Sequence, residues 1–129
     1  MAQGITTINN YMNNYGTLTT NSSSAAWAIG TAVWNTSYYN IGTPTAITLT
    51  MPSYTLSTTK AHSFGQGEIR ICFKAGANTT MNITWASGQT HSGVPDLSFS
   101  QDNYYEISIA PITASHMAVT VKEWTTDAV

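Results

Sequence analysis

Three histidines are the residues that could bind a metal ion. His62, His91 and His116 lie far apart in the sequence, each in a polar or turn-like stretch. Zinc sites usually place two His or Cys ligands a few residues apart, so that one turn or hairpin positions both. None of these histidines has such a neighbour. We therefore predict structural or solvent-exposed histidines, with no metal ion and no other cofactor.

Three acidic residues could supply the two carboxylates that glycoside hydrolysis requires. These are Asp96, Asp102 and Glu106, and a hydrolase would hold two of them several Å apart across its substrate. Asp102 is followed by Asn103, a dipeptide typical of a turn before a strand. Glu106 then falls on the outward face of that strand. The pattern favours structural roles, and we predict that the protein is not an enzyme.

Cys72 is the single cysteine of the chain, so no disulfide within the chain is expected. A nucleophilic cysteine needs a nearby group that lowers its pKa, usually a histidine. The sequence around Cys72 offers none, and alternation places it among charged residues on one face of a strand. We expect an exposed thiol of ordinary reactivity.

The aromatic residues, 11% of the chain, fit two kinds of surface. Aromatic rings stack on the C–H faces of sugars, while neighbouring Asn and Thr side chains hydrogen-bond the sugar hydroxyls. The adjacent Tyr38 and Tyr39 are the candidate glycan contacts. Large rings are also enriched in cores and in the buried centres of protein interfaces. Core or interface is the favoured interpretation, and mutating Tyr38 and Tyr39 would separate the two.

Charge is distributed unevenly along the chain. Residues 1–59 contain no Asp, Glu, Lys, Arg or His, and the first charged side chain is Lys60. Charged residues make up 8% of the chain, whereas about a quarter is usual in soluble proteins. Thr, Ser, Asn and Tyr form hydrogen bonds but exert no long-range attraction or repulsion. The uncharged half therefore indicates a surface that meets other protein.

Length and charge exclude several classes of protein. The 129 residues make one ordinary domain, and 42% hydrophobic residues argue against disorder. Four Lys and Arg residues with a net charge of −2 argue against binding to nucleic acid. No apolar run is long enough to span a membrane, and the first residues do not resemble a secretion signal. We expect synthesis in a cytoplasm.

Apolar residues recur at every second position from Thr45 onward, which predicts strands. The alternating segments are 47–51, 69–73, 81–85, 97–99, 105–109 and 119–121. Short strands separated by Gly, Pro and Asn predict an antiparallel β-sandwich over residues 45–129. Its form would be that of a jelly roll or of a small barrel. Residues 1–44 are expected to form an N-terminal arm. In this arm Ile5, Ile8, Met12 and Tyr15 would line one face of a short helix.

A series of segments between residues 45 and 124 carries a family resemblance. They are, in chain order, Glu68 to Thr80 with its Ala75-Gly76-Ala77 turn, Ile83-Thr84-Trp85, Val94-Pro95, Tyr104 to Ile109 and Val121 to Trp124. The series resembles the small β-domain of many bacteriophage virion proteins, in which these strands and turns recur in this order. The chain departs from that pattern at residues 110–117, where a longer segment replaces a short turn. The resemblance implies a domain of heads, necks or tail fibres, and it carries over no catalytic residue.

Charge pattern and resemblance together predict a virion structural protein, a decoration or fibre subunit. It would assemble through its uncharged segment with copies of itself, as a trimer, and with other virion proteins. The predicted interface residues are Ile5, Ile8, Met12, Tyr15, Trp27 and Trp34, buried only when a neighbour is present. The alternative is a carbohydrate-binding module of a tail fibre that recognises a host surface glycan.

Overall fold

The computed structural model describes residues 17–55, 67–93 and 97–126. These residues form nine β-strands and no helix. The strands are β1 (Thr17–Asn21), β2 (Ala26–Thr31), β3 (Thr36–Asn40), β4 (Ala46–Thr50), β5 (Ile69–Lys74), β6 (Thr80–Thr84), β7 (Thr90–Gly93), β8 (Tyr104–Pro111) and β9 (His116–Trp124). The prediction of an all-β fold is confirmed, and the predicted helix in residues 1–16 lies outside the described residues.

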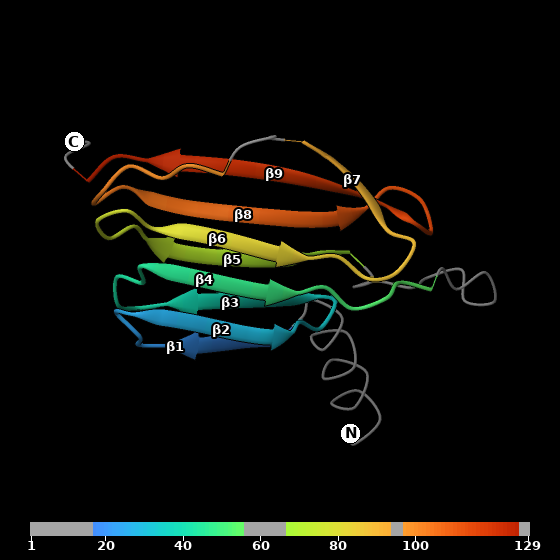
Figure 1. Cartoon of the computed structure of the whole chain (residues 1–129), viewed down its shortest axis with the longest axis horizontal. Helices are drawn as coiled ribbons and strands as arrows, with labels where there is room; N and C mark the ends of the chain where they lie inside the picture. The colour runs from blue at the N-terminus through green and yellow to red at the C-terminus, as the bar shows by residue number, and fades with distance from the viewer. Residues whose placement is uncertain (1–16, 56–66, 94–96, 127–129) are drawn as a thin grey trace, which may run out of the picture.

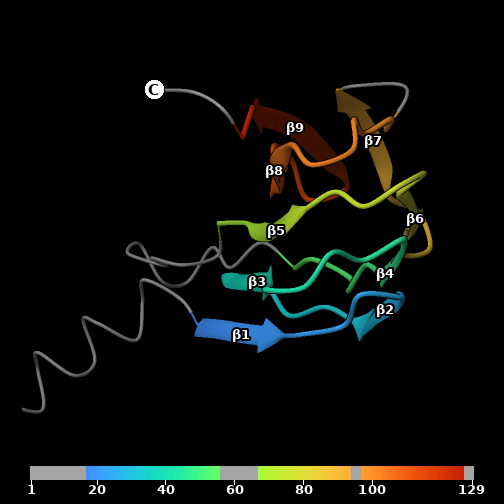
Figure 2. The ribbon, with the colours of Figure 1, turned by 90° about the vertical axis from the view of Figure 1, so that its left-hand side faces the viewer.

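The first six strands alternate between two sheets. Strands β1, β3 and β5 lie side by side in a six-stranded sheet of order β1-β3-β5-β8-β9-β7, while β2, β4 and β6 form a three-stranded sheet. Each odd strand and the even strand that follows it make one turn of a coil, and successive coils stack in parallel (Figures 1 and 2). The chain therefore winds back and forth between two layers.

The last strands close one end of the stack in a different way. β8 pairs antiparallel with β5, β9 pairs antiparallel with β8, and β7 lies parallel to β9 at the sheet edge. The predicted antiparallel arrangement is correct for the β5–β8 and β8–β9 pairs. It is wrong for the other five pairings, which are parallel. Alternation of apolar residues reports which side chains share a face. It reports neither the neighbour of a strand nor its direction.

The expected boundary at residue 44 does not separate two structural units among the described residues. β3 lies before that position, and it pairs in register with β5 of the later segment, as in Tyr38 beside Ile71. β2 likewise pairs with β4 across the boundary. The change in composition near residue 44 is a change in surface chemistry, and both halves contribute strands to the same two sheets.

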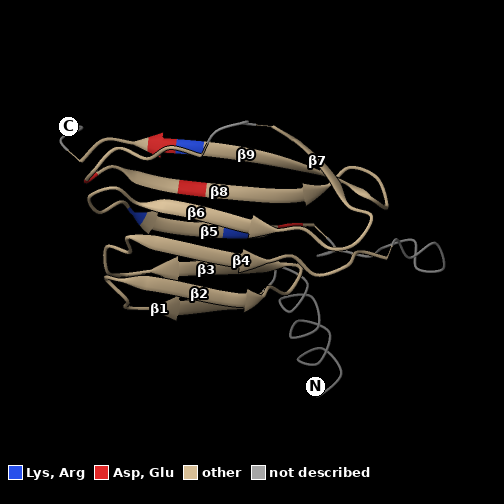
Figure 3. Cartoon of the chain, in the orientation of Figure 1, with Lys and Arg blue, Asp and Glu red and all other residues tan. Residues whose placement is uncertain are grey.

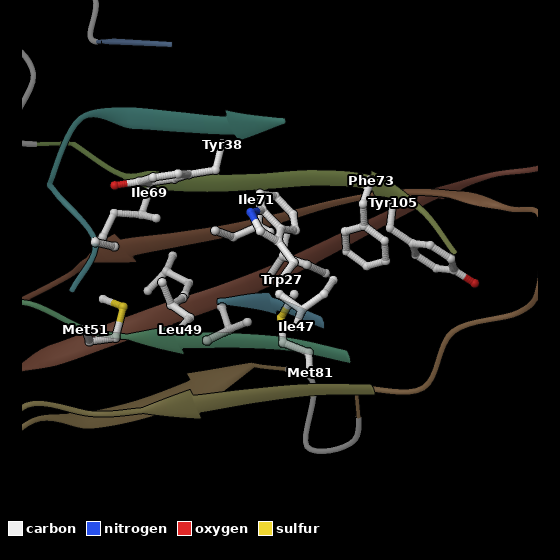
Figure 4. Close-up of a cluster of buried hydrophobic side chains, with 14 of the residues drawn as sticks. Trp27, Tyr38, Ile47, Leu49, Met51, Ile69, Ile71, Phe73, Met81 and Tyr105 are labelled. Carbon is white, nitrogen blue, oxygen red and sulfur yellow. The ribbon is translucent and has the colours of Figure 1, made fainter. Parts of the chain in front are cut away.

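One hydrophobic core lies between the two layers. Ile69, Ile71 and Phe73 point inward from β5, and each is almost fully buried. Leu49 and Ile47 meet them from β4 on the opposite sheet (Figure 4). Alternation along these strands puts every second side chain into this core. The remaining positions of β5 face outward.

Two turns of neighbouring coils are joined by a buried hydroxyl. Thr79 is 5% exposed, and its Oγ1 donates to the carbonyl of Pro44, 2.8 Å away. The same oxygen accepts from the backbone N–H of Gly76 at 2.8 Å. A buried hydroxyl with both functions satisfied stabilises the corner between the two coils. This corner fixes how the turn that follows β5 stacks on the turn that follows β3.

Candidate functional site

β1 forms one edge of the six-stranded sheet, and all five of its residues are exposed. It contains no charged residue and no proline, and its pairing with β3 shows no shift of register. Proteins usually protect an edge strand with charges, prolines or bulges, because its unpaired backbone groups can bind another strand. β1 has none of these protections.

Two of the five residues of β1 direct their backbone groups away from the sheet. Thr17 N–H donates to the carbonyl of Asn35, and the carbonyl of Asn21 accepts from Ile41 N–H at 2.8 Å. In a parallel pair, alternate residues of a strand bond the same neighbour. The backbone N–H and C=O of Leu18 and Thr20 therefore face outward. We call this row of groups the open edge.

Two side-chain pairs repeat between β1 and β3. Thr17 lies beside Thr36, with hydroxyl oxygens 2.7 Å apart. Asn21 lies beside Asn40, and its Oδ1 accepts from the Asn40 amide at 3.5 Å. Like residues stacked in register form ladders that continue from strand to strand. Thr17 and Asn21 are the exposed end of such a ladder.

Charge is confined to one part of the stack, as Figure 3 shows. Among the described residues, the charged side chains belong to β5, β8, β9 and the segments that adjoin them. They are Glu68, Arg70, Lys74, Asp102, Glu106, Lys122 and Glu123. The strands β1 to β4 carry none. The open edge therefore lies at the uncharged end of the structure.

The outer face of the six-stranded sheet carries a network of ion pairs. Glu106 forms ion pairs with Arg70 Nη2 and Lys122 Nζ, both at 3.3 Å. Arg70 Nε also lies 3.2 Å from Glu68 Oε1, although the pair is not aligned for a hydrogen bond. Glu106 is only 15% exposed, and two cations compensate its buried charge. The predicted outward position of Glu106 is correct.

A groove of about 840 Å³ crosses this outer face at the ends of β3, β5, β8 and β9. Tyr39, Ile41, Lys74, Tyr104 and Trp124 line it, and we call it the aromatic groove. Tyr39, Tyr104 and Trp124 are 37%, 46% and 52% exposed. Lys74, Tyr104 and Trp124 are register partners across β5, β8 and β9. The groove thus combines exposed rings with a cation.

Tyr39 and Cys72 form the floor of the groove, and both hold their protons more tightly than usual. Burial raises the pKa of the Cys72 thiol, and the Glu106 carboxylate raises it further. The nearby Cys72 raises the pKa of Tyr39, with partial burial as the second cause. Both groups are therefore neutral at pH 7, and the expected thiol of ordinary reactivity is instead half-buried and harder to ionise.

The two candidate glycan contacts have different environments. Tyr39 lies in the aromatic groove, whereas Tyr38 is 9% exposed and its hydroxyl accepts from Val33 N–H at 3.0 Å. Opposite directions are expected for adjacent residues of a strand. Tyr104 and Trp124 complete the groove and were not among the predicted glycan contacts. Their outward parity on β8 and β9 is visible in the sequence, but their pairing is not.

The two tryptophans of the predicted interface both contact other residues of the same chain. Trp27 is 4% exposed in the core (Figure 4), so its burial requires no neighbour, contrary to expectation. Trp34 packs edge-on against Tyr54 with centroids 5.3 Å apart, and its Nε1 donates to the carbonyl of Ser53. The other predicted interface residues, Ile5, Ile8, Met12 and Tyr15, lie outside the described residues.

Two histidines lie near the β7 edge, His91 on β7 and His116 on β9. His91 stacks on Trp85 with ring centroids 4.2 Å apart. His116 lies between the hydroxyls of Thr90 and Ser92, at 2.6 and 2.9 Å from its two ring nitrogens. Residues 17–55, 67–93 and 97–126 contain no cluster of His, Cys, Asp and Glu suited to a metal ion. His62 and Asp96 lie outside these ranges.

Asp102 occupies the turn before β8, as predicted. Its φ of 69° is a left-handed conformation that Asp adopts more readily than most residues.

Within the described part of the chain, no helix has the length and apolar character needed to cross a membrane. Comparison of the sequence and the structure with family models, curated proteins and solved structures yields no match.

Proposed function

We propose that the protein is a structural subunit of a bacteriophage virion, of decoration or fibre type, and that the open edge of β1 joins it to a neighbouring copy. The virion context rests on the resemblance of residues 45–124 to virion β-domains. The mode of attachment rests on the chemistry of β1.

The open edge, which pairs with no other described strand, is the observation that carries this proposal. A strand with exposed, uncharged residues and regular register is a template for another strand. In a monomer this would be a liability. In an assembly subunit it supplies a defined attachment point, because backbone hydrogen bonds fix the orientation of the added strand. The Thr17 and Asn21 ladder would then continue into the neighbour.

The energetics favour assembly of many copies over a tight isolated pair. Each net hydrogen bond at Leu18 and Thr20 contributes about 0.5–1.5 kcal/mol. Leu18 is 67% exposed, and fully burying a leucine side chain contributes about 1.5–3 kcal/mol. Such a contact is weak alone and strengthens when a lattice engages several contacts at once. No charge has to be desolvated, so the association should be nearly independent of salt.

Light scattering of the free protein, up to millimolar concentration, tests the proposal. Thr20→Pro removes one outward N–H of the open edge. It leaves the hydrogen bonds from β1 to β3 intact, because the backbone N–H of Thr20 points away from β3. Leu18→Lys places a charge beside the open edge. We expect the unmodified chain to self-associate and both variants to remain monomeric. The measured mass also tests the predicted trimer.

Thr48→Lys is the matched control, because Thr48 is exposed on β4, a strand with neighbours on both sides. It adds the same charge at a position without an open backbone, and self-association should persist. Circular dichroism checks that each variant keeps its β-structure. A monomeric unmodified chain at the highest concentration, or variants that associate like the control, would refute attachment through β1. The predicted contacts Ile5, Ile8, Met12 and Tyr15 are tested separately by mutation.

A further inference from the structure

The aromatic groove has features that attachment through β1 does not use. It lies on the outer face of the six-stranded sheet, whereas the open edge runs along β1. Three aromatic side chains converge there with more than a third of each exposed to solvent. Exposed apolar surface gathered in a groove is typical of a binding site.

The pairing of β8 and β9 places two of the rings side by side. Tyr104 and Trp124 are directly opposite each other in an antiparallel pair, and neighbouring strands lie about 4.8 Å apart. That spacing is the scale of one sugar ring. Tyr39 lies two strands away from Tyr104 on the same outer face, with β5 between them. The rings thus form a short platform across the sheet.

Polar groups in the groove are fixed in position around this platform. Glu106 is held by Arg70 and Lys122, and Tyr39 lies beside its register partner Cys72. Groups already held in place lose little entropy when a ligand binds. Hydrogen-bonding groups next to exposed rings suit a ligand that has apolar faces and a polar rim.

Lys74 is the cation of the groove that is free to meet an anionic ligand. Its Nζ lies 5.7 Å from the centroid of the Tyr104 ring, and it forms no ion pair with any described residue. Arg70 and Lys122, by contrast, are both engaged by Glu106. A carboxylate bound next to Tyr104 would pair with Lys74 without displacing an existing partner.

We propose that the aromatic groove binds an acidic oligosaccharide. Its sugar rings stack on Tyr39, Tyr104 and Trp124, and one carboxylate of the sugar pairs with Lys74. A protein partner is less suited to this surface, because the centres of protein interfaces are depleted of charge, while Lys74 and Glu106 both line the groove. The volume of about 840 Å³ lies within the range of small-ligand sites.

A glycan array with matched acidic and neutral oligosaccharides tests the proposal, followed by calorimetric titration of the best ligand. We expect acidic glycans to bind, and Trp124→Ala to weaken binding about tenfold or more through loss of a stacked ring. Trp124→Phe should retain most of the affinity because it keeps a ring. Lys74→Gln should weaken binding of the acidic glycan and leave a neutral analogue unaffected.

Ile112→Ala is the matched control, because Ile112 is an exposed apolar residue at the opposite end of β8 and outside the groove. The Ile112→Ala variant should bind the acidic glycan with the affinity of the unmodified chain. Thr20→Pro should also bind the glycan normally, so failure of the assembly proposal can be told apart from failure of this one. Absence of glycan binding, preference for neutral glycans, or unchanged affinity in Trp124→Ala would overturn the proposal.

Discussion

Tyr39 on β3 and Cys72 on β5 are register partners, and both line the aromatic groove. Each residue keeps its proton to higher pH than it would in an unfolded chain. Burial is the main cause for Cys72, and the proximity of Cys72 is the main cause for Tyr39. This pair links the ionisation of the groove to the stability of the fold.

The stability of the protein should fall at alkaline pH. The folded thiol has a pKa above its ordinary value of 9.0, so the unfolded chain loses its proton first as the pH rises. The stabilisation is complete below that value and disappears as the pH passes through the higher pKa of the folded state. Urea unfolding at a series of pH values measures it. Cys72→Ser should have a shallower pH dependence, and an unchanged slope would contradict this explanation.

Glu123 should have a pKa below its ordinary value of 4.5. The Tyr105 hydroxyl donates to its carboxylate, and this is the largest cause, followed by the Asn103 amide. The resulting stability is present above the unfolded pKa and is lost as the pH falls through the folded one. NMR titration of the carboxyl carbon should show a higher pKa in Tyr105→Phe. Asn103→Ala should raise it by a smaller amount, and equal shifts would contradict the order of causes.

Gly93 should not tolerate a side chain. Its φ is 139°, and an added Cβ would lie 2.1 Å from the carbonyl oxygen of Val119 on the neighbouring β9. We expect Gly93→Ala to lower the free energy of unfolding by about 1–3 kcal/mol or more. Gly67→Ala is the control, because nothing lies within 4 Å of its added Cβ. Thermal unfolding measures both variants, and equal stabilities would contradict the clash with Val119.

Ile107 and Ile112 offer a matched test of the core. Ile107 is fully buried on β8, whereas Ile112 is 62% exposed after its end. Ile107→Ala should destabilise the fold by about 2–5 kcal/mol through lost burial and a residual cavity. Ile112→Ala should change stability by less than about 0.5 kcal/mol. Denaturant unfolding measures both, and similar effects would place the core elsewhere.

The pattern of inward and outward residues was predictable from the sequence. Ile69, Ile71 and Phe73 were assigned to one face of a strand and Arg70 and Cys72 to the other, and the structure agrees. The turns at Asn78 and Asp102 were also predicted, and both residues adopt positive φ. These features depend on neighbours in the chain, because side-chain direction alternates along a strand and turn residues are set by local backbone geometry.

The sequence contains a signal for the stacked coils. Thr17 and Asn21 recur 19 positions later as Thr36 and Asn40, and the structure places each residue beside its repeat. Internal repetition of this kind indicates coils of similar length. The longer connection between β4 and β5 interrupts the period before a third coil could reveal it.

The sequence by itself determined the all-β character, the alternation of each strand and the uncharged first half. The direction of strand pairing, the alternation of β1 to β6 between two sheets and the position of the open edge were decided by the tertiary structure. The same holds for the aromatic groove, whose residues Tyr39, Tyr104 and Trp124 come from three strands. Residues distant in the chain meet only when the sheet forms, and a local pattern contains no information on which strands will be neighbours.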